Sequence, residues 1–333
     1  MRGARRAGSE LRPLALRLHP PKHPGPRDTE ELSRSRTQDG GQGEGSMRIA
    51  TLDDPELDGA LACPDTDERV PGVLALGGSD GGIPTYLERL LAAERCACLA
   101  LAYHGSPTTQ PNLIEVPLER LERALRWLRD HPRVAPRDGR VAVVGASKGA
   151  ELALVLATTF PDLVGPVVAY TPSSVVWAGI DFSARDAPPR SSWSRAGTPL
   201  QFVPLPPGVP PVQTERGLSL APIFDRGLDG VAADDAAIIP IERATGPVLL
   251  ISGRDDRMWP ASRMSRMLVD RARRFGREHL VRHLDFADAG HALFAVDPAD
   301  LKQPMPFDLG GSEAAQAGAH EVAWPQVLRV LLG

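Results

Sequence analysis

Residues 141–157 of the chain have the sequence VAVVGASKGAELALVLA. The apolar run Val141–Val144 is typical of a buried strand, and the segment after Lys148 has the composition of a helix. Between them, GASKG fits the pattern G-x-S-x-G, in which a serine lies on a sharp strand-to-helix turn with its hydroxyl exposed above the sheet. The pattern alone also occurs as a structural glycine turn, but the strand before it and the helix after it favour Ser147 as a nucleophile.

The chain around this motif, from Met47 onward, alternates short apolar runs with helical patterns. Strands are expected at Gly72–Leu76, Ala97–Ala102, Arg140–Val144, Gly165–Tyr170, Pro247–Ser252 and Leu280–Leu284. Helices are expected at Pro84–Ala93, Pro117–His131, Lys148–Thr158, Ala261–Phe275 and Glu313–Leu332. Such alternation is typical of a parallel sheet covered by helices. The chain is therefore predicted to form one doubly wound α/β domain over residues 47–333, with a mostly parallel sheet.

Composition excludes several classes of protein. The 333 residues include 38 Lys+Arg and 42 Asp+Glu, and the net charge of −4 argues against nucleic-acid binding by bulk electrostatics. No apolar run approaches the ~18 residues of a membrane span. The cysteines Cys63, Cys96 and Cys98 lack metal-ligand spacing and are odd in number, which favours a reducing compartment. We expect a cytoplasmic protein that binds a small molecule and neither nucleic acid nor membrane.

Residues 1–46 differ in composition from the rest, being rich in proline and glycine and poor in large apolar side chains. Such a segment cannot bury enough surface to offset its chain entropy, so it is predicted to be a disordered extension. Arg5-Arg6 suggests twin-arginine export, but the nearby apolar run is interrupted by Arg17 and is too short for a signal peptide. A start site placed too far upstream of Met47 is an alternative explanation.

A serine nucleophile needs a base, and the base needs an orienting acid. In this kind of fold, acid and histidine follow the serine in that order. His291 lies in a loop after the last expected strand and is predicted to be the base. Two aspartates follow the strand that ends near Gly253, and the usual strand-then-G-x-x-D arrangement favours Asp256 over Asp255.

Acyl transfer also needs N–H donors for the developing oxyanion. The backbone N–H of Lys148, next to the nucleophile, is predicted to be one donor. The other is expected from the glycine-rich loop after the first strand, with Ser79 favoured and Gly78 as the alternative. That loop matches neither G-x-G-x-x-G nor the Walker pattern of phosphate-binding loops. Beyond this, Lys148 and Glu151 are interpreted as ordinary residues of the first helical turn.

The stretch of residues 171–246 is too long for an ordinary connection, since such loops usually run about 2–6 residues. It is either a surface excursion or, as its place after the elbow favours, a cap-like insertion that lines a substrate pocket. Trp177 and Trp193 within it are candidate substrate-binding residues. His104, on the loop after the second expected strand, is a third candidate; it precedes the serine, which argues against a role as base.

Several segments together resemble a known family. They are GVLALGGSDGGIPTYLERLLAAERCACLALAY, VAVVGASKGAELALVLATTFPD, GPVLLISGRDDRMWPASRMSRML and FADAGH. Over residues 73–332 the chain resembles the C-terminal catalytic domain of acyl-CoA thioesterases, a family that includes bile acid-CoA:amino acid N-acyltransferases. The resemblance implies an α/β-hydrolase fold and a triad that acts on acyl-CoA thioesters. The matching positions are Ser147, Asp256 and His291.

The predicted function is hydrolysis of an acyl-CoA thioester, or a related acyl ester, through an acyl-enzyme and without metal or redox cofactor. One alternative is a general carboxylesterase or dienelactone-hydrolase-like enzyme. Another is an acyl-CoA:amino acid N-acyltransferase, although the conjugating members of the family typically have cysteine where this chain has Ser147. A non-catalytic binding module is disfavoured because such proteins usually lose a member of the triad, and here all of its members are present.

Overall fold

An eight-stranded sheet forms the centre of the fold, and its middle strands are the apolar runs of the sequence. The computed structural model describes residues 47–333 except 85–86, 88–90, 92–93, 185–186 and 295–305. In spatial order the strands are β1 (Met47–Thr51), β2 (Asp58–Pro64), β4 (Ala97–Ala102), β3 (Gly72–Leu76), β6 (Val141–Ala146), β7 (Val164–Tyr170), β12 (Val248–Gly253) and β13 (Val281–Phe286). β2 pairs antiparallel with β1 and β4, and the other neighbours are parallel.

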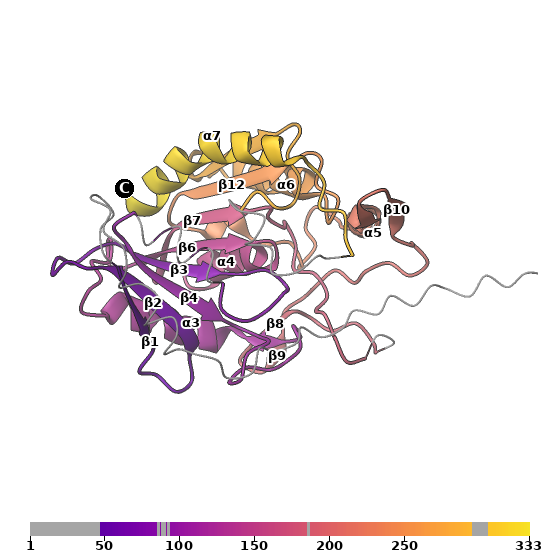
Figure 1. The fold of residues 1–333 in the computed structure, drawn as a ribbon. Helices are drawn as coiled ribbons and strands as arrows, with labels where there is room; N and C mark the ends of the chain where they lie inside the picture. Colours follow the sequence, from indigo (N-terminus) through magenta and orange to yellow (C-terminus); the bar gives the residue numbers. More distant parts are fainter. Residues whose placement is uncertain (1–46, 85–86, 88–90, 92–93, 185–186, 295–305) are drawn as a thin grey trace, which may run out of the picture.

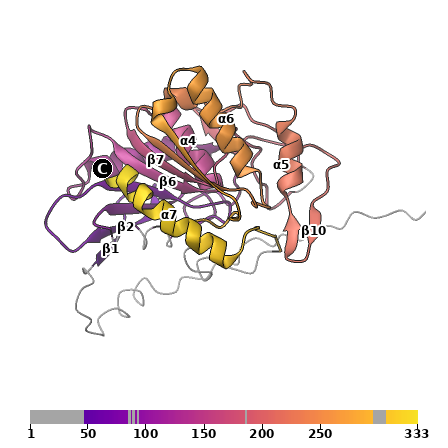
Figure 2. The same ribbon diagram turned by 90° about the horizontal axis from the view of Figure 1, so that it is seen from above.

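Helices cover both faces of this sheet (Figures 1 and 2). α3 (Leu118–Asp130), α4 (Lys148–Thr159) and α6 (Ala261–Arg274) contribute to the apolar cluster on one face, whereas α7 (Glu313–Leu332) packs on the other. Strands β3, β4, β6 and β7 are buried along their whole length, as expected for parallel strands with helices on both faces. The predicted α/β-hydrolase architecture is confirmed.

The region between β7 and β12 contains small elements of its own. They are β8 (Trp193–Arg195), β9 (Thr198–Pro199), β10 (Val212–Thr214), β11 (Gly217–Ser219), α5 (Ala221–Leu228) and the 3₁₀ turn η1 (Ile241–Arg243). β8 pairs with β9 and with β5 (Val116–Pro117), which precedes α3. In Figure 1, β8 and β9 lie near the bottom of the view, and α5 and β10 lie apart from them on the right. That this region is a cap over a substrate pocket remains a prediction.

The insertion has its own apolar cluster, which joins it to the rest of the domain. Trp177, Val203 and Leu228 pack with Trp259 and Met264, which belong to the segment around the start of α6. Trp177 makes an edge contact with Phe224 at a centroid distance of 4.9 Å. The insertion is therefore anchored close to the loop that follows β12.

Most expected elements have their observed counterparts within one or two residues. No bounds were predicted for the antiparallel pair β1–β2 or for the short strands of the insertion. Residues 1–46 and most of the helix expected at Pro84–Ala93 lie outside the described residues. All three cysteines are buried free thiols. Among the helices that the structure describes, none is long and apolar enough to cross a membrane.

Candidate active site

Ser147 lies between β6 and α4 with a strained backbone. Its φ of 54° and ψ of −119° are rarely adopted by a residue with a side chain, and such a conformation costs about 1–3 kcal/mol. It persists because its surroundings hold it. The Ser147 N–H donates to the Tyr170 carbonyl at 3.0 Å, and the Ser147 carbonyl accepts from the N–H groups of Ala150 and Glu151 at 2.9 and 3.1 Å. The local geometry is that of a nucleophile elbow.

The glycines of the motif are required by close backbone contacts. A Cβ on Gly145 would lie 2.1 Å from the carbonyl oxygen of Gly149. A Cβ on Gly149 would lie 2.2 Å from the carbonyl oxygen of Gly77, in the loop after β3. The elbow therefore closes tightly on itself and against the neighbouring loop, which explains the residue types on either side of the serine.

His291 connects the serine to an aspartate. Its Nε2 lies 2.9 Å from Ser147 Oγ, and its Nδ1 lies 2.8 Å from Asp256 Oδ2. The side chains of His291 and Asp256 are buried, at 7% and 1% exposure. The second oxygen of Asp256 accepts from the N–H groups of Met258 and Trp259 at 2.9 and 3.1 Å, which fixes the carboxylate. The three residues predicted from chain order thus form one hydrogen-bonded line.

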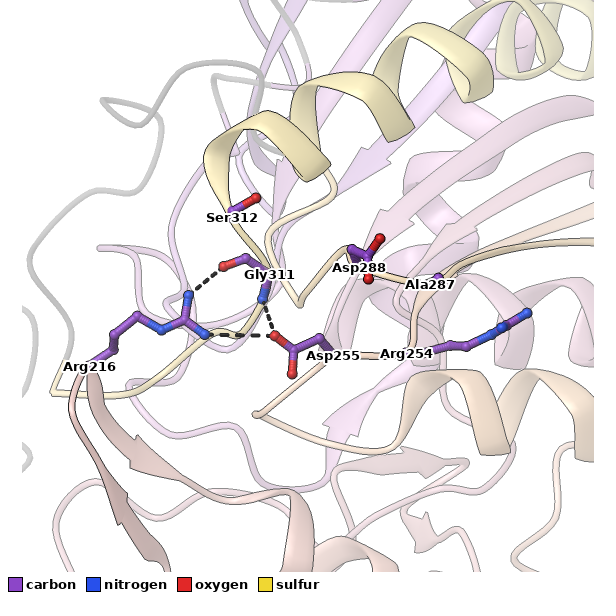
Figure 3. A pocket seen from close by; sticks show the side chains of 7 residues that line it. All are labelled: Arg216, Arg254, Asp255, Ala287, Asp288, Gly311 and Ser312. Carbon is purple, nitrogen blue, oxygen red and sulfur yellow. Dashed lines mark hydrogen bonds and ion pairs between the residues drawn. The ribbon is translucent and has the colours of Figure 1, made fainter.

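Asp255, the other candidate acid, points its carboxylate toward Gly311 and Arg216 (Figure 3). Its carboxylate accepts from the Gly311 N–H at 2.8 Å and from Arg257 Nε at 2.6 Å, and Arg216 lies 3.7 Å away. It lines a surface pocket of about 510 Å³ together with Asp288 and other charged side chains. Of the two aspartates, the structure brings only Asp256 to His291.

Of the predicted oxyanion donors, Lys148 directly follows Ser147 in the chain and Gly78 lies beside it. A Cβ on Gly78 would be 3.6 Å from the Cβ of Ser147, so the loop after β3 passes beside the nucleophile. The Tyr103 hydroxyl lies 2.8 and 2.9 Å from the carbonyl oxygens of Gly77 and Gly78 and holds this loop. Within the part of the chain that the structure describes, the N–H groups of Gly78, Ser79 and Lys148 have no acceptor. That they donate to an oxyanion stays a prediction.

The side chains of Lys148 and Glu151 overturn the interpretation of ordinary helix residues. Lys148 Nζ lies 2.7 Å from both carboxylate oxygens of Glu151, and the side chains are 6% and 0% exposed. Burial lowers the pKa of Lys148 and raises that of Glu151, and each charge opposes the shift of the other. Two charges in an otherwise apolar helix, three residues apart, were the sequence signal for this pair.

The proposed substrate-binding residues lie in the interior. Trp177, Trp193 and His104 are 1%, 0% and 1% exposed. The Trp193 indole N–H donates to Glu151, and the His104 ring stacks on Phe182 with its centroid 6.3 Å away. Burial, with a smaller contribution from the Lys148 charge, lowers the pKa of His104 to about 4. Trp193 packs against the Lys148–Glu151 pair and His104 against Gly81 in the loop after β3, and contact of these side chains with substrate stays a prediction.

Comparison with known proteins gives the family. The family model described as BAAT / Acyl-CoA thioester hydrolase C terminal matches residues 116–331. The chain belongs to this family. The match includes the elbow, the acid loop and His291, so the hydrogen-bonded line lies within the part that defines the thioester hydrolase C-terminal family. Within the described residues, no group of three or more His, Cys, Asp or Glu side chains could hold a metal ion.

Curated relatives within this family carry two kinds of name. Acyl-coenzyme A amino acid N-acyltransferase 1 of Mus musculus is 29% identical over 282 residues, which cover 81% of this chain and 61% of the relative. Acyl-coenzyme A thioesterase 1 of Homo sapiens is 26% identical, with the same coverage. The mouse peroxisomal succinyl-coenzyme A thioesterase is 27% identical over 78% of this chain and 58% of its own length. The chain spans about three fifths of the length of these relatives.

Solved structures show the same fold at low identity. A dienelactone hydrolase-like promiscuous phosphotriesterase from metagenomic libraries has a TM-score of 0.52 and 19% identity, covering 87% of this chain and all of that one. Acylaminoacyl peptidase of Pyrococcus horikoshii has a TM-score of 0.51 and 15% identity, covering 87% of this chain and 42% of that one. At these identities the likeness concerns the fold alone.

Proposed function

We propose that this protein hydrolyses acyl-CoA thioesters as a serine hydrolase. The observation that carries the proposal is His291, whose two ring nitrogens lie within hydrogen-bond distance of Ser147 and Asp256. Membership of a family described by acyl-CoA thioester hydrolysis supports the substrate class. The names of the curated thioesterase relatives agree with it.

In the proposed mechanism, Ser147 Oγ attacks the thioester carbonyl while His291 Nε2 accepts the hydroxyl proton. Asp256 holds the Nδ1–H and stabilises the imidazolium that forms. The N–H of Lys148 and one from the Gly78–Ser79 loop donate to the oxyanion. As the intermediate collapses, the C–S bond breaks, and His291 returns the proton to the leaving CoA thiolate. Water, activated by the same histidine, then releases the carboxylic acid and restores Ser147.

The substrate class is tested by a hydrolysis panel with the full chain. Acyl-CoAs of graded chain length are compared with p-nitrophenyl esters of the same acids. We expect higher kcat/KM values for the thioesters at one or more chain lengths. A uniform preference for the esters would favour the general carboxylesterase or dienelactone-hydrolase-like alternative instead.

Acyl transfer to an amino acid is the second candidate, because curated relatives bear that name. A serine nucleophile gives an oxygen ester, whose breakdown depends on His291 activating a small nucleophile, most readily water. A cysteine gives a thioester, which reacts readily with amines. We expect free carboxylic acid as the product of wild-type protein even with abundant glycine or taurine. Mass spectrometry that found mainly N-acyl amino acid would instead establish the transferase.

We also propose that residues 47–333 are the catalytic unit, with residues 171–246 as its cap, and that the protein acts in the cytoplasm. Removing residues 1–46 should leave kcat/KM and the melting temperature unchanged. A lower kcat/KM or a lower melting temperature would show that residues 1–46 contribute to the activity or the stability of the domain. Fractionation of the source cells tests the compartment, because relatives include a protein named as peroxisomal.

A further inference from the structure

The buried ion pair beside the nucleophile connects two parts of the molecule. Glu151 Oε1 accepts from the Trp193 indole N–H at 2.8 Å and from the Trp177 backbone N–H at 3.4 Å. Lys148 Nζ donates to Ser192 Oγ at 2.8 Å, and that hydroxyl donates to the Trp177 carbonyl at 2.9 Å. Lys148 Nζ also lies 5.2 Å from the centre of the Trp193 ring. Two side chains of α4 thus bind the insertion at three of its residues.

Stability alone gives little reason for charges at this place. A buried ion pair seldom stabilises a fold more than apolar residues of the same volume, because both charges must leave water. Once the pair is buried, however, each charge depends on the other, because removal or displacement of either partner leaves an unpaired charge in the interior. The pair therefore disfavours any arrangement of the first turn of α4 that would separate its two charges.

That turn contains the atoms whose position matters most. Lys148 is the residue after the strained Ser147, and its N–H is the proposed oxyanion donor. Glu151 is tied to Ser147 through its own N–H and to Lys148 through its carboxylate. Oxyanion stabilisation depends on donors that are already in place when the charge develops. An element that fixes both ends of this turn would act directly on that step.

We propose that Glu151 is a positioning residue for the oxyanion site. It holds the Lys148 backbone in place through the ion pair. Through its hydrogen bonds with Trp193 and Trp177, it makes the position of the Lys148 backbone depend on how the insertion packs against α4. The inference rests on the proposed function, since it concerns the N–H donor of the same reaction. Loss of Glu151 should weaken binding of the transition state and leave binding of the ground state unchanged.

The test is Glu151→Gln, which removes the charge and keeps an oxygen that can accept from Trp193. We expect kcat for acyl-CoA hydrolysis to fall by about 10- to 100-fold, since loss of a whole oxyanion donor costs about 10²–10³. KM should stay within about threefold. Affinity for a trifluoromethyl ketone, which forms an oxyanion on Ser147, should fall in parallel with kcat. Unchanged kcat and inhibitor affinity would overturn the proposal.

Two further variants separate positioning from folding. Lys148→Met/Glu151→Gln leaves no unpaired charge, so its melting temperature should approach that of the wild type while the loss in kcat persists. Recovery of both the melting temperature and kcat in the double variant would show that the ion pair contributes to folding and not to catalysis. Trp193→Phe keeps an aromatic ring and removes the N–H, and a smaller parallel loss in kcat and inhibitor affinity is expected; no loss in either would count against the proposal.

Two controls complete the test. Glu242→Gln makes the same substitution in another bidentate pair, Arg271–Glu242, which joins α6 to η1; it should change neither kcat nor inhibitor affinity. Equal losses in this control would mean that the effect is general and the proposal wrong. Ser147→Ala tests the proposed function separately: an active Ser147→Ala protein refutes the mechanism itself. An inactive one with fully active Glu151→Gln refutes only the positioning role.

Discussion

The elbow at Ser147 and the loop that bears Asp256 each follow a strand of the same parallel sheet, yet they hold their residues by different means. At the elbow, the backbone is strained and is kept in place by glycine contacts and by bonds to neighbouring segments. In the acid loop, the side chain of Asp256 binds the N–H groups of its own turn at Met258 and Trp259. The conformation of the elbow therefore depends on neighbouring segments, whereas the position of the Asp256 carboxylate depends largely on hydrogen bonds within its own loop.

This difference has a consequence for how each region responds to substitution. Substitutions in the loop after β3 or in the insertion should also affect the elbow, because both segments contact it or the first turn of α4 directly. A change near Asp256 should remain local unless it alters the carboxylate.

Ser147→Ala should have the largest effect. The reacting oxygen is lost while the backbone and core contacts remain, so turnover should fall by ~10⁶-fold if the triad behaves like that of subtilisin. Circular dichroism and melting temperature should be close to wild type. Steady-state hydrolysis of the best acyl-CoA measures the loss, and an activity within tenfold of wild type would exclude Ser147 as the nucleophile.

In the acid loop, Asp256→Asn should reduce kcat by ~10⁴-fold, as the corresponding substitution does in a chymotrypsin-type protease, because the amide favours the wrong histidine tautomer. Asp255→Asn is the matched control. It breaks contacts with Arg257 and Gly311 at a half-exposed position and should cost less than about tenfold, since exposed ion pairs contribute little. The reverse ranking would make Asp255 the acid.

Backbone crowding at the elbow gives the third effect. Gly149→Ala places a Cβ 2.2 Å from a backbone carbonyl oxygen, which neither strand nor helix can avoid without moving. We expect a loss of about 3 kcal/mol or more in the free energy of unfolding, the upper end for overpacking. Gly318→Ala, on the exposed face of α7 with nothing within 4 Å, should instead stabilise by about 0.5–1 kcal/mol. Urea titrations of both variants provide the comparison.

The sequence predicted the central strands and the elbow because their signals are local. An apolar run of five or six residues and a glycine-flanked serine need no knowledge of distant parts of the chain. For the acid, the G-x-x-D arrangement favoured Asp256 without excluding Asp255, since the direction of each carboxylate depends on contacts with residues such as Gly311 and His291. The bounds and the pairing of β1 and β2 were not predicted because their sequence pattern is weak and the strands are partly exposed.

The Lys148–Glu151 pair shows the opposite limit. Its spacing was visible, but charges at the start of a helix are ordinarily solvated, and only the insertion packed above α4 removes them from water. Trp177 and Trp193 were interpreted as pocket lining for a related reason: an aromatic residue in a long insertion has no pattern that distinguishes lining from core. Tertiary packing decides both cases.

The smallest effect concerns pH and the loop beside the elbow. His104 packs against Gly81, where an added Cβ would lie 3.0 Å from its ring, and burial lowers its pKa from 6.5 to about 4. The unfolded chain therefore binds a proton between about pH 6.5 and pH 4 that the folded chain does not. Stability must fall as the pH decreases through this range, by about 2 kcal/mol between pH 7 and pH 5.

His104→Leu removes this titration and puts an apolar side chain of similar size in place of the imidazole. The difference in unfolding free energy between pH 7 and pH 5, measured by urea titration, should be smaller in the variant by that amount. Since the two proteins differ only at residue 104, the comparison isolates the contribution of His104. An identical pH dependence in the two proteins would mean that His104 has the same pKa in the folded and the unfolded chain, which would contradict the lowering of its pKa by burial.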